Sequence, residues 1–448
     1  MINNRYVTRA NALKGMLRLG QTGRVLGQTA LSWMLGDRPS TPRLLRQTFE
    51  RLGATYIKLG QFIASSPSLF PEAYVEEFQR CLDKTDPLPF ALLRPVIEED
   101  LGCTLDAVFS EVDPVPLASA SIAQVHGARL KNGDAVVIKV QKPGVASILV
   151  TDLNFLYICA WLFERFFPKM KFASLAAVIE EIQSCMMDEV DFFKEATHIR
   201  QFEAYLQRTG NDKVVVPKVY TEASGRRVLT MERLYGVPLT DLESIRKYTR
   251  DPAMTLVTAM NTWFASLTQC ESFHADLHAG NLMVLTDGRV AFIDFGIVGR
   301  IAPSTWKATM GFVDALGGGD FDLMARSMAG IGMTRHAVDV EHLSADLRGI
   351  YEAFNGVDPD DLLMGDVKEG QINRVLFDVV AVGERHGIHF PRAFALLLKQ
   401  VLYFDRYVKI LAPEMNMFDD SRLDFAIDGM PLVALGADLP LDFSGEYR

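Results

Sequence analysis

A short block of acidic and amide residues restricts the fold of this chain more than any other feature of its sequence. Asp276 is followed five residues later by Asn281, and a short β-hairpin expected at 283–293 then leads to an Asp-Phe-Gly tripeptide that begins at Asp294. This order and spacing are typical of a protein-kinase-like phosphotransfer site. In such a site Asp276 accepts the proton of an attacking hydroxyl, while Asn281 and Asp294 offer the hard oxygen ligands that Mg²⁺ prefers.

Each part of this block has an ordinary explanation when it stands alone. An Asp-Phe-Gly tripeptide is often only a turn, and a single histidine such as His274 or His278 is commonly a hydrogen-bonded core residue. A second motif changes this interpretation. The apolar run 136–138 is followed by Lys139, which matches the strand lysine that contacts the α- and β-phosphates of ATP in kinases. A buried ammonium group needs an anionic partner. The sequence therefore predicts that the chain binds ATP together with Mg²⁺.

The partner of Lys139 is expected from an acidic cluster in a long helical stretch at 175–206. Glu189, Asp191 and Glu195 lie close together there, and the last two are four residues apart, where like charges on one helix face repel each other. A cationic group should therefore lie opposite, either Lys139 or magnesium. The alternative is a solvated acidic face of a helix.

Prolines, glycines and changes of periodicity predict the organisation of the chain. Apolar residues at helical spacing predict one helix from Pro42 to about Ser65 and a second from Pro71 to Cys81. An Asn-Gly pair between two apolar runs predicts a hairpin over 121–140, further strands are expected at 214–219 and 227–231, and 317–319 is expected to be a loop. The predicted parts are a basic amphipathic segment at 1–41, a helical extension at 42–90, a kinase-like N-lobe at 91–235, a helical kinase-like C-lobe at 236–418 and an acidic tail at 419–448.

Composition excludes other classes of function. Lysine and arginine total 46 against 56 acidic residues, so the net charge of −10 argues against a nucleic-acid partner. The five cysteines form no C-x-x-C pair, which fits thiols in a reducing compartment. The most apolar stretch, 153–163, is too short to cross a bilayer, so we expect a cytoplasmic protein without a transmembrane helix.

The N-terminal segment has two interpretations. It carries five basic residues and no acidic residue before Asp37, with leucines and a tryptophan between them. Such a segment could lie on the anionic inner face of a membrane as a peripheral contact. It could equally be an amphipathic helix packed on its own domain, although five glycines between Gly15 and Gly36 disfavour one long helix.

Two features depart from ordinary protein kinases. Alanines and serines stand where a glycine-rich loop would cover the phosphates, so the backbone must approach the nucleotide differently. No Ala-Pro-Glu follows, and Ala275 stands where an arginine would meet a phosphorylated activation loop, which disfavours a protein substrate. The candidate nucleotide-contacting residues besides Lys139 are Ala118, Ser119, Ala120 and Ser121 in that loop, and Met231 and Glu232 at the end of a predicted strand.

Together these residues resemble the UbiB/AarF/ADCK family of atypical kinases. The tetrapeptide 58–61 is similar to the family's K-x-G-Q signature, the alanine-rich stretch replaces a glycine-rich loop, and 189–191 is similar to its E-x-D motif. The resemblance implies an α+β, two-lobed protein-kinase-like fold with an all-helical N-terminal extension. It also implies that Lys58 and Gln61 belong to a regulatory lid over the active site, with Lys58 near Glu189 and Asp191, and that Glu195 pairs with Lys139.

The resemblance further implies an enzyme of the kinase or ATPase type. Its expected activity is ATP hydrolysis, or transfer of the γ-phosphoryl group to a small or lipid-like acceptor, in ubiquinone and other prenyl-lipid metabolism. A lipid or quinone-like molecule is therefore an expected partner, whereas no protein partner is indicated. The longer bacterial members of the family end in transmembrane helices, which this sequence does not show. The alternative is a nucleotide-switched lipid-binding module with little turnover.

Overall fold

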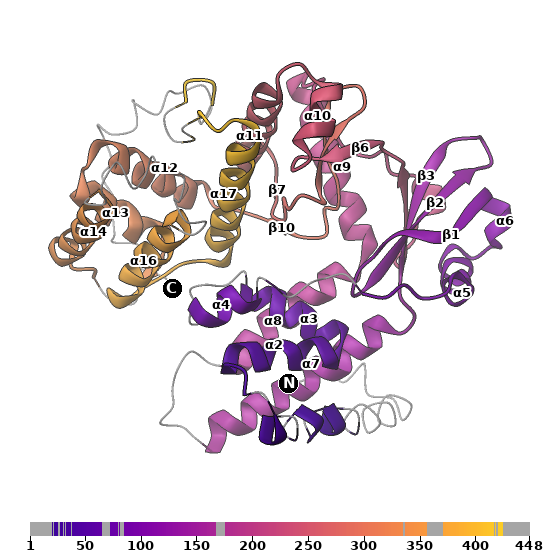
Figure 1. Cartoon of the computed structure of the whole chain (residues 1–448), viewed down its shortest axis with the longest axis horizontal. Coiled ribbons are helices and arrows are strands. Elements are labelled where there is room, and N and C mark those ends of the chain that lie inside the picture. The colour runs from indigo at the N-terminus through magenta and orange to yellow at the C-terminus, as the bar shows by residue number, and fades with distance from the viewer. Residues whose placement is uncertain are drawn as a thin grey trace, which may run out of the picture. The chain divides into compact units, whose positions relative to one another are not determined.

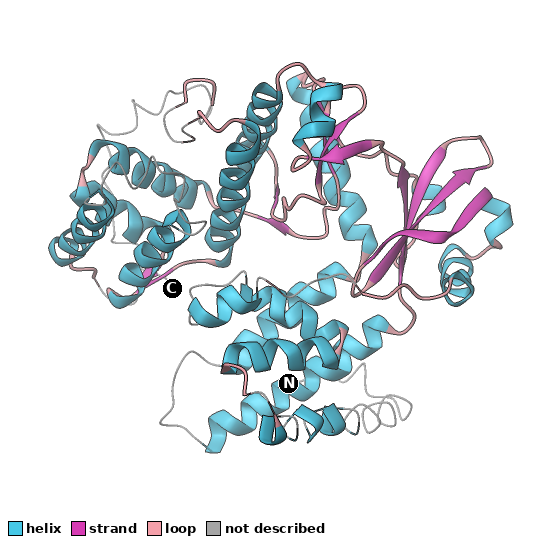
Figure 2. Cartoon of the chain, viewed as in Figure 1, coloured by secondary structure: helices cyan, strands magenta, loops and turns pink. Residues whose placement is uncertain are grey.

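Contacts between residues divide the chain into two units in the computed structural model. Figure 1 labels the helices and strands of the chain, and Figure 2 colours them by type. The first unit comprises Met1–Arg200 and Pro217–Leu234, and the second comprises Gln201–Val216 and Tyr235–Arg448. The sequence placed a boundary at 235–236 and assigned 201–216 to the N-lobe, whereas these residues belong to the second unit. The structure describes residues 20, 22–25, 27–29, 31, 33–36, 38–64, 72–78, 80, 85–166, 175–334, 337–355, 371–415, 417 and 420–423.

The first unit contains a four-stranded antiparallel sheet in the order β1-β2-β3-β5. The predicted Asn-Gly turn joins β2 to β3, where Gly133 has a φ of 95° that favours glycine. Helix α5 covers one face, so that Leu93 and Ile97 share a core with Ile138. The strands are β1 Phe109–Ser119, β2 Ala123–Leu130, β3 Ala135–Gln141 and β5 Val228–Glu232, and the short helices beside them are α5 Phe90–Leu101, α6 Leu105–Val108 and η1 Thr221–Ala223.

A second group of helices in the first unit packs together (Figure 1). The single helix predicted from Pro42 to Ser65 is wrong, because the chain forms two helices that are separated by Gly53. Gly53 has a φ of 95°, which residues with a side chain rarely adopt. The helix predicted at 71–81 is described at 72–78. The helices are α2 Thr41–Leu52, α3 Ala54–Ala64, α4 Glu72–Phe78, α7 Val145–Phe166 and α8 Leu175–Glu189.

The long helix predicted at 175–206 is also wrong. Helix α8 ends at Glu189, and α9 (Phe192–Thr209) begins after a break at 190–191 and continues from the first unit into the second. At the break the Phe192 N–H donates to the carbonyl of Arg226 over 3.0 Å, and the Asp191 carboxylate accepts the Phe193 N–H over 3.2 Å. Asp191 therefore precedes α9, and it does not share one helix face with Glu195 as the sequence suggested.

The second unit has its own four-stranded sheet in the order β4-β9-β8-β6. The strand predicted at 214–219 is only β4 (Val214–Val215), which pairs in parallel with β9 of this unit. Pro217 has no N–H to continue the ladder. The remaining strands are β6 Gly236–Pro238, β7 Phe273–His274, β8 Leu282–Leu285, β9 Val290–Phe292, β10 Val298–Gly299, β11 Met333–Thr334 and β12 Ile388–His389.

Helices form the rest of the second unit. Helix α17 lies along α11, where the rings of Phe404 and Trp263 are 5.3 Å apart (Figure 1). The loop predicted at 317–319 is wrong in part, because α12 continues to Gly318 and only Gly319, whose φ is 67°, lies outside the helix. The helices are α10 Leu242–Tyr248, α11 Pro252–Gln269, α12 Pro303–Gly318, α13 Phe321–Ile331, α14 Val340–Asn355, α16 Gln371–Arg385 and α17 Arg392–Leu411.

The two ends of the chain are described only in part. In the predicted amphipathic segment, residues 22–25, 27–29 and 33–35 are helical, and Trp33, Met34 and Leu35 are exposed. Of the predicted acidic tail, only 420–423 lie within the described residues. No helix in the described parts of the chain is long and apolar enough to cross a membrane.

Candidate active site

Asp276 in the second unit follows strand β7, and the side chain of His274 holds its backbone N–H. Its N–H donates to Nδ1 of His274 over 3.2 Å, while Nε2 of the same ring donates to the carbonyl of Ile293 over 3.0 Å. These contacts place the imidazole proton on Nε2. Burial outweighs the other influences and lowers the pKa of His274, so the ring is neutral at neutral pH. His274 therefore acts as a structural link between the Asp276 loop and the end of β9.

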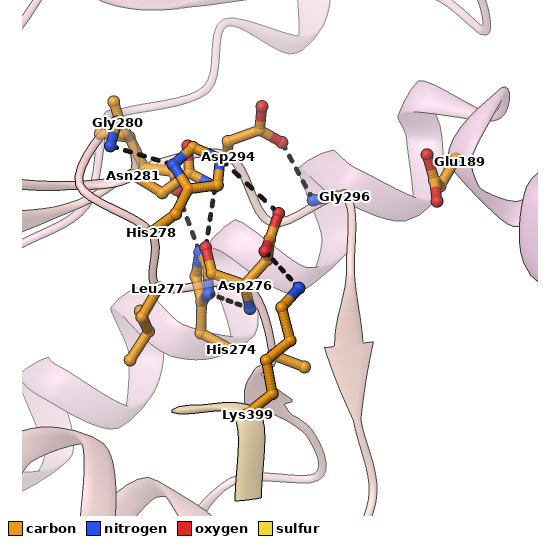
Figure 3. Close-up of polar contacts among 12 residues, drawn as sticks. Glu189, His274, Asp276, Leu277, His278, Gly280, Asn281, Asp294, Gly296 and Lys399 are labelled. Atoms are coloured by element: carbon orange, nitrogen blue, oxygen red, sulfur yellow. Dashed lines mark hydrogen bonds and ion pairs between the residues drawn. The ribbon is translucent and has the colours of Figure 1, made fainter. Parts of the chain in front are cut away.

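Asn281 comes directly before strand β8, and Asp294 comes shortly after strand β9, so the two residues flank the β8–β9 hairpin in the sequence (Figure 3). The side-chain Nδ2 of Asn281 donates to the carbonyl of Asp276 over 2.9 Å, and the backbone carbonyl of Asn281 accepts the N–H of Ile293 over 2.9 Å. Asp294 has a φ of 59°, a left-handed conformation that is uncommon for a residue other than glycine. Such backbone strain persists only where the surrounding structure enforces it and is concentrated at functional sites.

The surroundings of Asp294 show how that conformation is held. The Gly296 N–H donates to Oδ1 of Asp294 over 3.3 Å. Phe295 is buried, and its ring centroid lies 4.7 Å from that of His274 and 5.3 Å from that of Phe202 on α9. The Asp-Phe-Gly tripeptide is therefore anchored by its aromatic residue, and its glycine N–H holds the Asp294 carboxylate (Figure 3).

Two cationic or basic side chains accompany Asp276. Nζ of Lys399 on α17 lies 2.8 Å from Oδ1 of Asp276, and Nε2 of His278 lies 3.8 Å from Oδ2. Burial raises the pKa of Asp276, but the charge of Lys399 and then that of His278 outweigh it, so the pKa lies below its usual value. Asp276 is therefore ionised at neutral pH. Sequence reasoning missed Lys399, since it lies 123 residues further along the chain and belongs to no motif.

In the first unit, Lys139 on β3 forms an ion pair with Glu195 on α9. Its Nζ lies 2.8 Å from Oε1 and 2.9 Å from Oε2, so both carboxylate oxygens are engaged. The Lys139 side chain is 11% exposed and that of Glu195 is 4% exposed. The ammonium also lies 5.5 Å from the centre of the Phe192 ring. These are the two residues that the sequence assigned to each other.

The two acids of the 189–191 tripeptide have different partners. Nζ of Lys58 on α3 lies 2.8 Å from Oε2 of Glu189, and both side chains are largely buried. Asp191 instead accepts from the exposed Arg226, whose Nε lies 3.5 Å away. Gln61 lies one turn further along α3 and is half-buried. The sequence analysis placed Lys58 near both acids, and the structure contains an ion pair of Lys58 with Glu189 and one of Arg226 with Asp191.

The alanine-rich stretch forms the turn between β1 and β2. Ala118 and Ser119 are the last residues of β1 that pair with β2. The Ala120 N–H then donates to the carbonyl of Ala123 over 2.8 Å. Thr85 binds this turn twice, because its N–H donates to the Ser119 carbonyl over 3.2 Å and its hydroxyl donates to the Ala120 carbonyl over 2.7 Å. The turn continues through Ser121, which is buried.

Met231 and Glu232 lie at the end of β5. Met231 is buried, whereas Glu232 is exposed. The carboxylate of Glu232 accepts the N–H of Lys218 over 3.3 Å, and the Glu232 N–H donates to the Lys218 carbonyl over 2.8 Å. Lys218 therefore fixes both the backbone and the side chain at this end of the strand.

The donors at 276–294 fit a magnesium ion that is shared with phosphates. Asn281 uses Nδ2 for the Asp276 carbonyl, so its Oδ1 lies on the opposite side of the amide, and Asp294 supplies a carboxylate. Among the described residues, no three histidine, cysteine, aspartate or glutamate side chains are grouped closely enough to hold a metal ion. Mg²⁺ is usually held by one or two carboxylates together with substrate phosphates and water, and Asp294 is a carboxylate of the kind that such a site uses.

Comparison with known proteins gives matches over most of the chain. A family model described as the ABC1 atypical kinase-like domain matches residues 80–328. An uncharacterized aarF domain-containing protein kinase of Arabidopsis thaliana, described as chloroplastic, is 48% identical over 403 residues, which cover 86% of this chain and 75% of that protein. An uncharacterized protein of Mycobacterium tuberculosis is 33% identical over 400 residues, with coverages of 85% and 76%. A probable protein kinase UbiB of Azotobacter vinelandii is 30% identical over 396 residues, with coverages of 87% and 72%.

Proposed function

Since this chain belongs to the ABC1 atypical kinase-like family, we propose that it binds ATP with Mg²⁺ and acts on the γ-phosphoryl group. The reaction is either hydrolysis or transfer to a small or lipid-like acceptor. The observation that best supports this proposal is the set of three side chains at the β7–β8–β9 loops: an ionised Asp276, Asn281 fixed by its amide, and Asp294 held at a φ of 59°. Phosphate release from ATP by wild type and by Asp294→Asn tests the proposal.

Each residue has a role that follows from its chemistry. Lys139, held by Glu195, would contact the α- and β-phosphates of ATP. Asn281 and Asp294 would hold the magnesium ion, which when bound neutralises charge on the phosphates. The turn 118–121 would lie against the nucleotide and the strand end at 231–232 near the adenine, as the sequence suggested.

Asp276 would act as the base of this reaction. The acceptor oxygen forms a bond to the γ-phosphorus while the bond from that phosphorus to the bridging oxygen of ADP breaks. The proton of the acceptor hydroxyl, or of water in hydrolysis, passes to the Asp276 carboxylate. A carboxylate can do this only when it is ionised, which is the state that Lys399 and His278 favour here.

A lipid or quinone-like acceptor is the finer part of the proposal. Relatives are named UbiB, and that name together with the sequence resemblance supports a role in ubiquinone or other prenyl-lipid metabolism. Exposed Trp33, Met34 and Leu35 in a basic segment support peripheral contact with an anionic membrane. A nucleotide-switched lipid-binding module with little turnover is the alternative, and it differs in releasing no phosphate.

The Lys58–Glu189 pair is proposed to restrain turnover as part of a lid. Lys58→Ala should raise ATP hydrolysis or autophosphorylation severalfold, because it removes the contact that ties α3 to the end of α8. Phosphate release and incorporation of labelled phosphate measure the effect, and the melting temperature reports whether the fold survives. Lys194→Ala is the matched control, since it breaks the neighbouring but solvent-exposed pair with Asp188. Wild-type kinetics in Lys58→Ala would remove the lid hypothesis.

A further inference from the structure

The backbone on both sides of Asp276 is held by side chains of α17. Oε1 of Gln400 accepts the N–H of Leu277 over 2.7 Å, and Nε2 of Gln400 donates to the carbonyl of Ala275 over 2.7 Å. The hydroxyl of Tyr407 donates to the carbonyl of Leu277 over 2.7 Å. Gln400 is 0% exposed and Tyr407 is 1% exposed, so water cannot replace these contacts. One helix therefore satisfies the buried polar groups that flank Asp276.

The same helix also contacts the Asp276 side chain. Lys399 precedes Gln400 and places its Nζ 2.8 Å from Oδ1 of Asp276 (Figure 3). The lysine side chain is 27% exposed and the carboxylate 20%, so the pair is at the edge of the buried region. Oδ1 is thereby engaged, whereas Oδ2 lies toward His278 at the longer distance of 3.8 Å. The loop itself carries Ala275, and not an arginine, before the acid.

We propose that α17 is the positioning element of the phosphotransfer loop, with Lys399 as the positioning residue that aims the carboxylate of Asp276. Lys399 holds one oxygen, so the other is presented to the phosphoryl acceptor. Gln400 and Tyr407 fix the backbone at 275–277, on which the position of the Asp276 carboxylate depends. The inference rests on the proposed function of Asp276, and it concerns residues that lie beyond the matched range 80–328.

The test compares Lys399→Met with wild type in the kcat and KM of phosphate release from MgATP at neutral pH. Without Lys399 the Asp276 carboxylate is no longer held in position, so kcat should fall by roughly ten- to 10²-fold with little change in KM for ATP. Lys399→Arg, which keeps the charge, should restore most of the activity.

Controls separate this inference from the proposed function. Lys409→Met removes an exposed lysine of the same helix, paired with Asp405, and should behave as wild type. If Lys399→Met does not fold, Lys399→Gln keeps a donor without the charge and should show the same loss of kcat with little change in KM. An active wild type together with an unchanged kcat in Lys399→Met would overturn the inference alone. A wild type that releases no phosphate would overturn the proposed function and the inference with it.

Discussion

Asp276→Asn should lower kcat for phosphate release from MgATP by roughly 10²- to 10⁴-fold, which is the range that a positioned general base contributes. The amide has nearly the shape of the carboxylate but cannot accept the acceptor's proton. Affinity for MgATP should change little, because Asp276 is assigned to proton transfer and not to binding. Steady-state phosphate release gives kcat, and titration calorimetry with MgATP gives the affinity.

Asp287→Asn serves as the control for this substitution. Asp287 lies in the β8–β9 turn of the same unit, where its half-exposed carboxylate pairs with Arg289 at the surface. It should keep wild-type kcat. An Asp276→Asn variant that retained wild-type kcat would contradict the assignment of Asp276 as the base, even if ATP binding were intact.

Lys139→Met should cost about 3–5 kcal/mol of stability, because it leaves a glutamate that is 4% exposed without its counter-charge. Replacing both partners removes the uncompensated charge, so Lys139→Met combined with Glu195→Met should recover much of that loss. Neither variant should hydrolyse ATP, since both lack the lysine that is proposed to contact the phosphates. Urea unfolding measures the stability, and phosphate release measures the activity.

The matched control is Lys131→Met, which removes an exposed lysine from the β2–β3 turn of the same unit. Surface substitutions of this kind usually change stability by less than about 0.5 kcal/mol. Equal stability of Lys139→Met and wild type would show that the pair is not a buried ionic contact. A double variant as unstable as the single variant would show that packing, and not the unpaired charge, causes the loss.

The fold class and the family could be predicted from local motifs, and both are confirmed. The spacing from Asp276 to Asn281, the Asp-Phe-Gly tripeptide and the strand that ends in Lys139 are short patterns, each set by a turn or a strand whose geometry the neighbouring residues determine. The match to the ABC1 model and the relatives over most of the chain agree with the predicted family. The prediction of the fold class and of the family therefore rested on residues that lie close together in the sequence.

Features that depend on distant segments could not be read in the same way. The helix break at 190–191 is fixed by the carbonyl of Arg226, whose position only the folded sheet determines. Apolar periodicity continues across the break, so it predicted one helix where there are two. Lys399 lies in an ordinary amphipathic helix, and nothing in its local sequence indicates a contact with an acid 123 residues earlier. Tertiary contacts decided both features.

Phosphate release from ATP with Mg²⁺, with and without anionic lipid vesicles, tests the central claim most directly when wild type is compared with Asp294→Asn. Asparagine tolerates the left-handed φ of 59° at this position, so the variant removes the charge of the proposed magnesium ligand without straining the backbone. We predict release by the wild type that vesicles stimulate and that Asp294→Asn abolishes. Nucleotide binding without phosphate release in either condition would contradict the account and would favour a nucleotide-switched lipid-binding module.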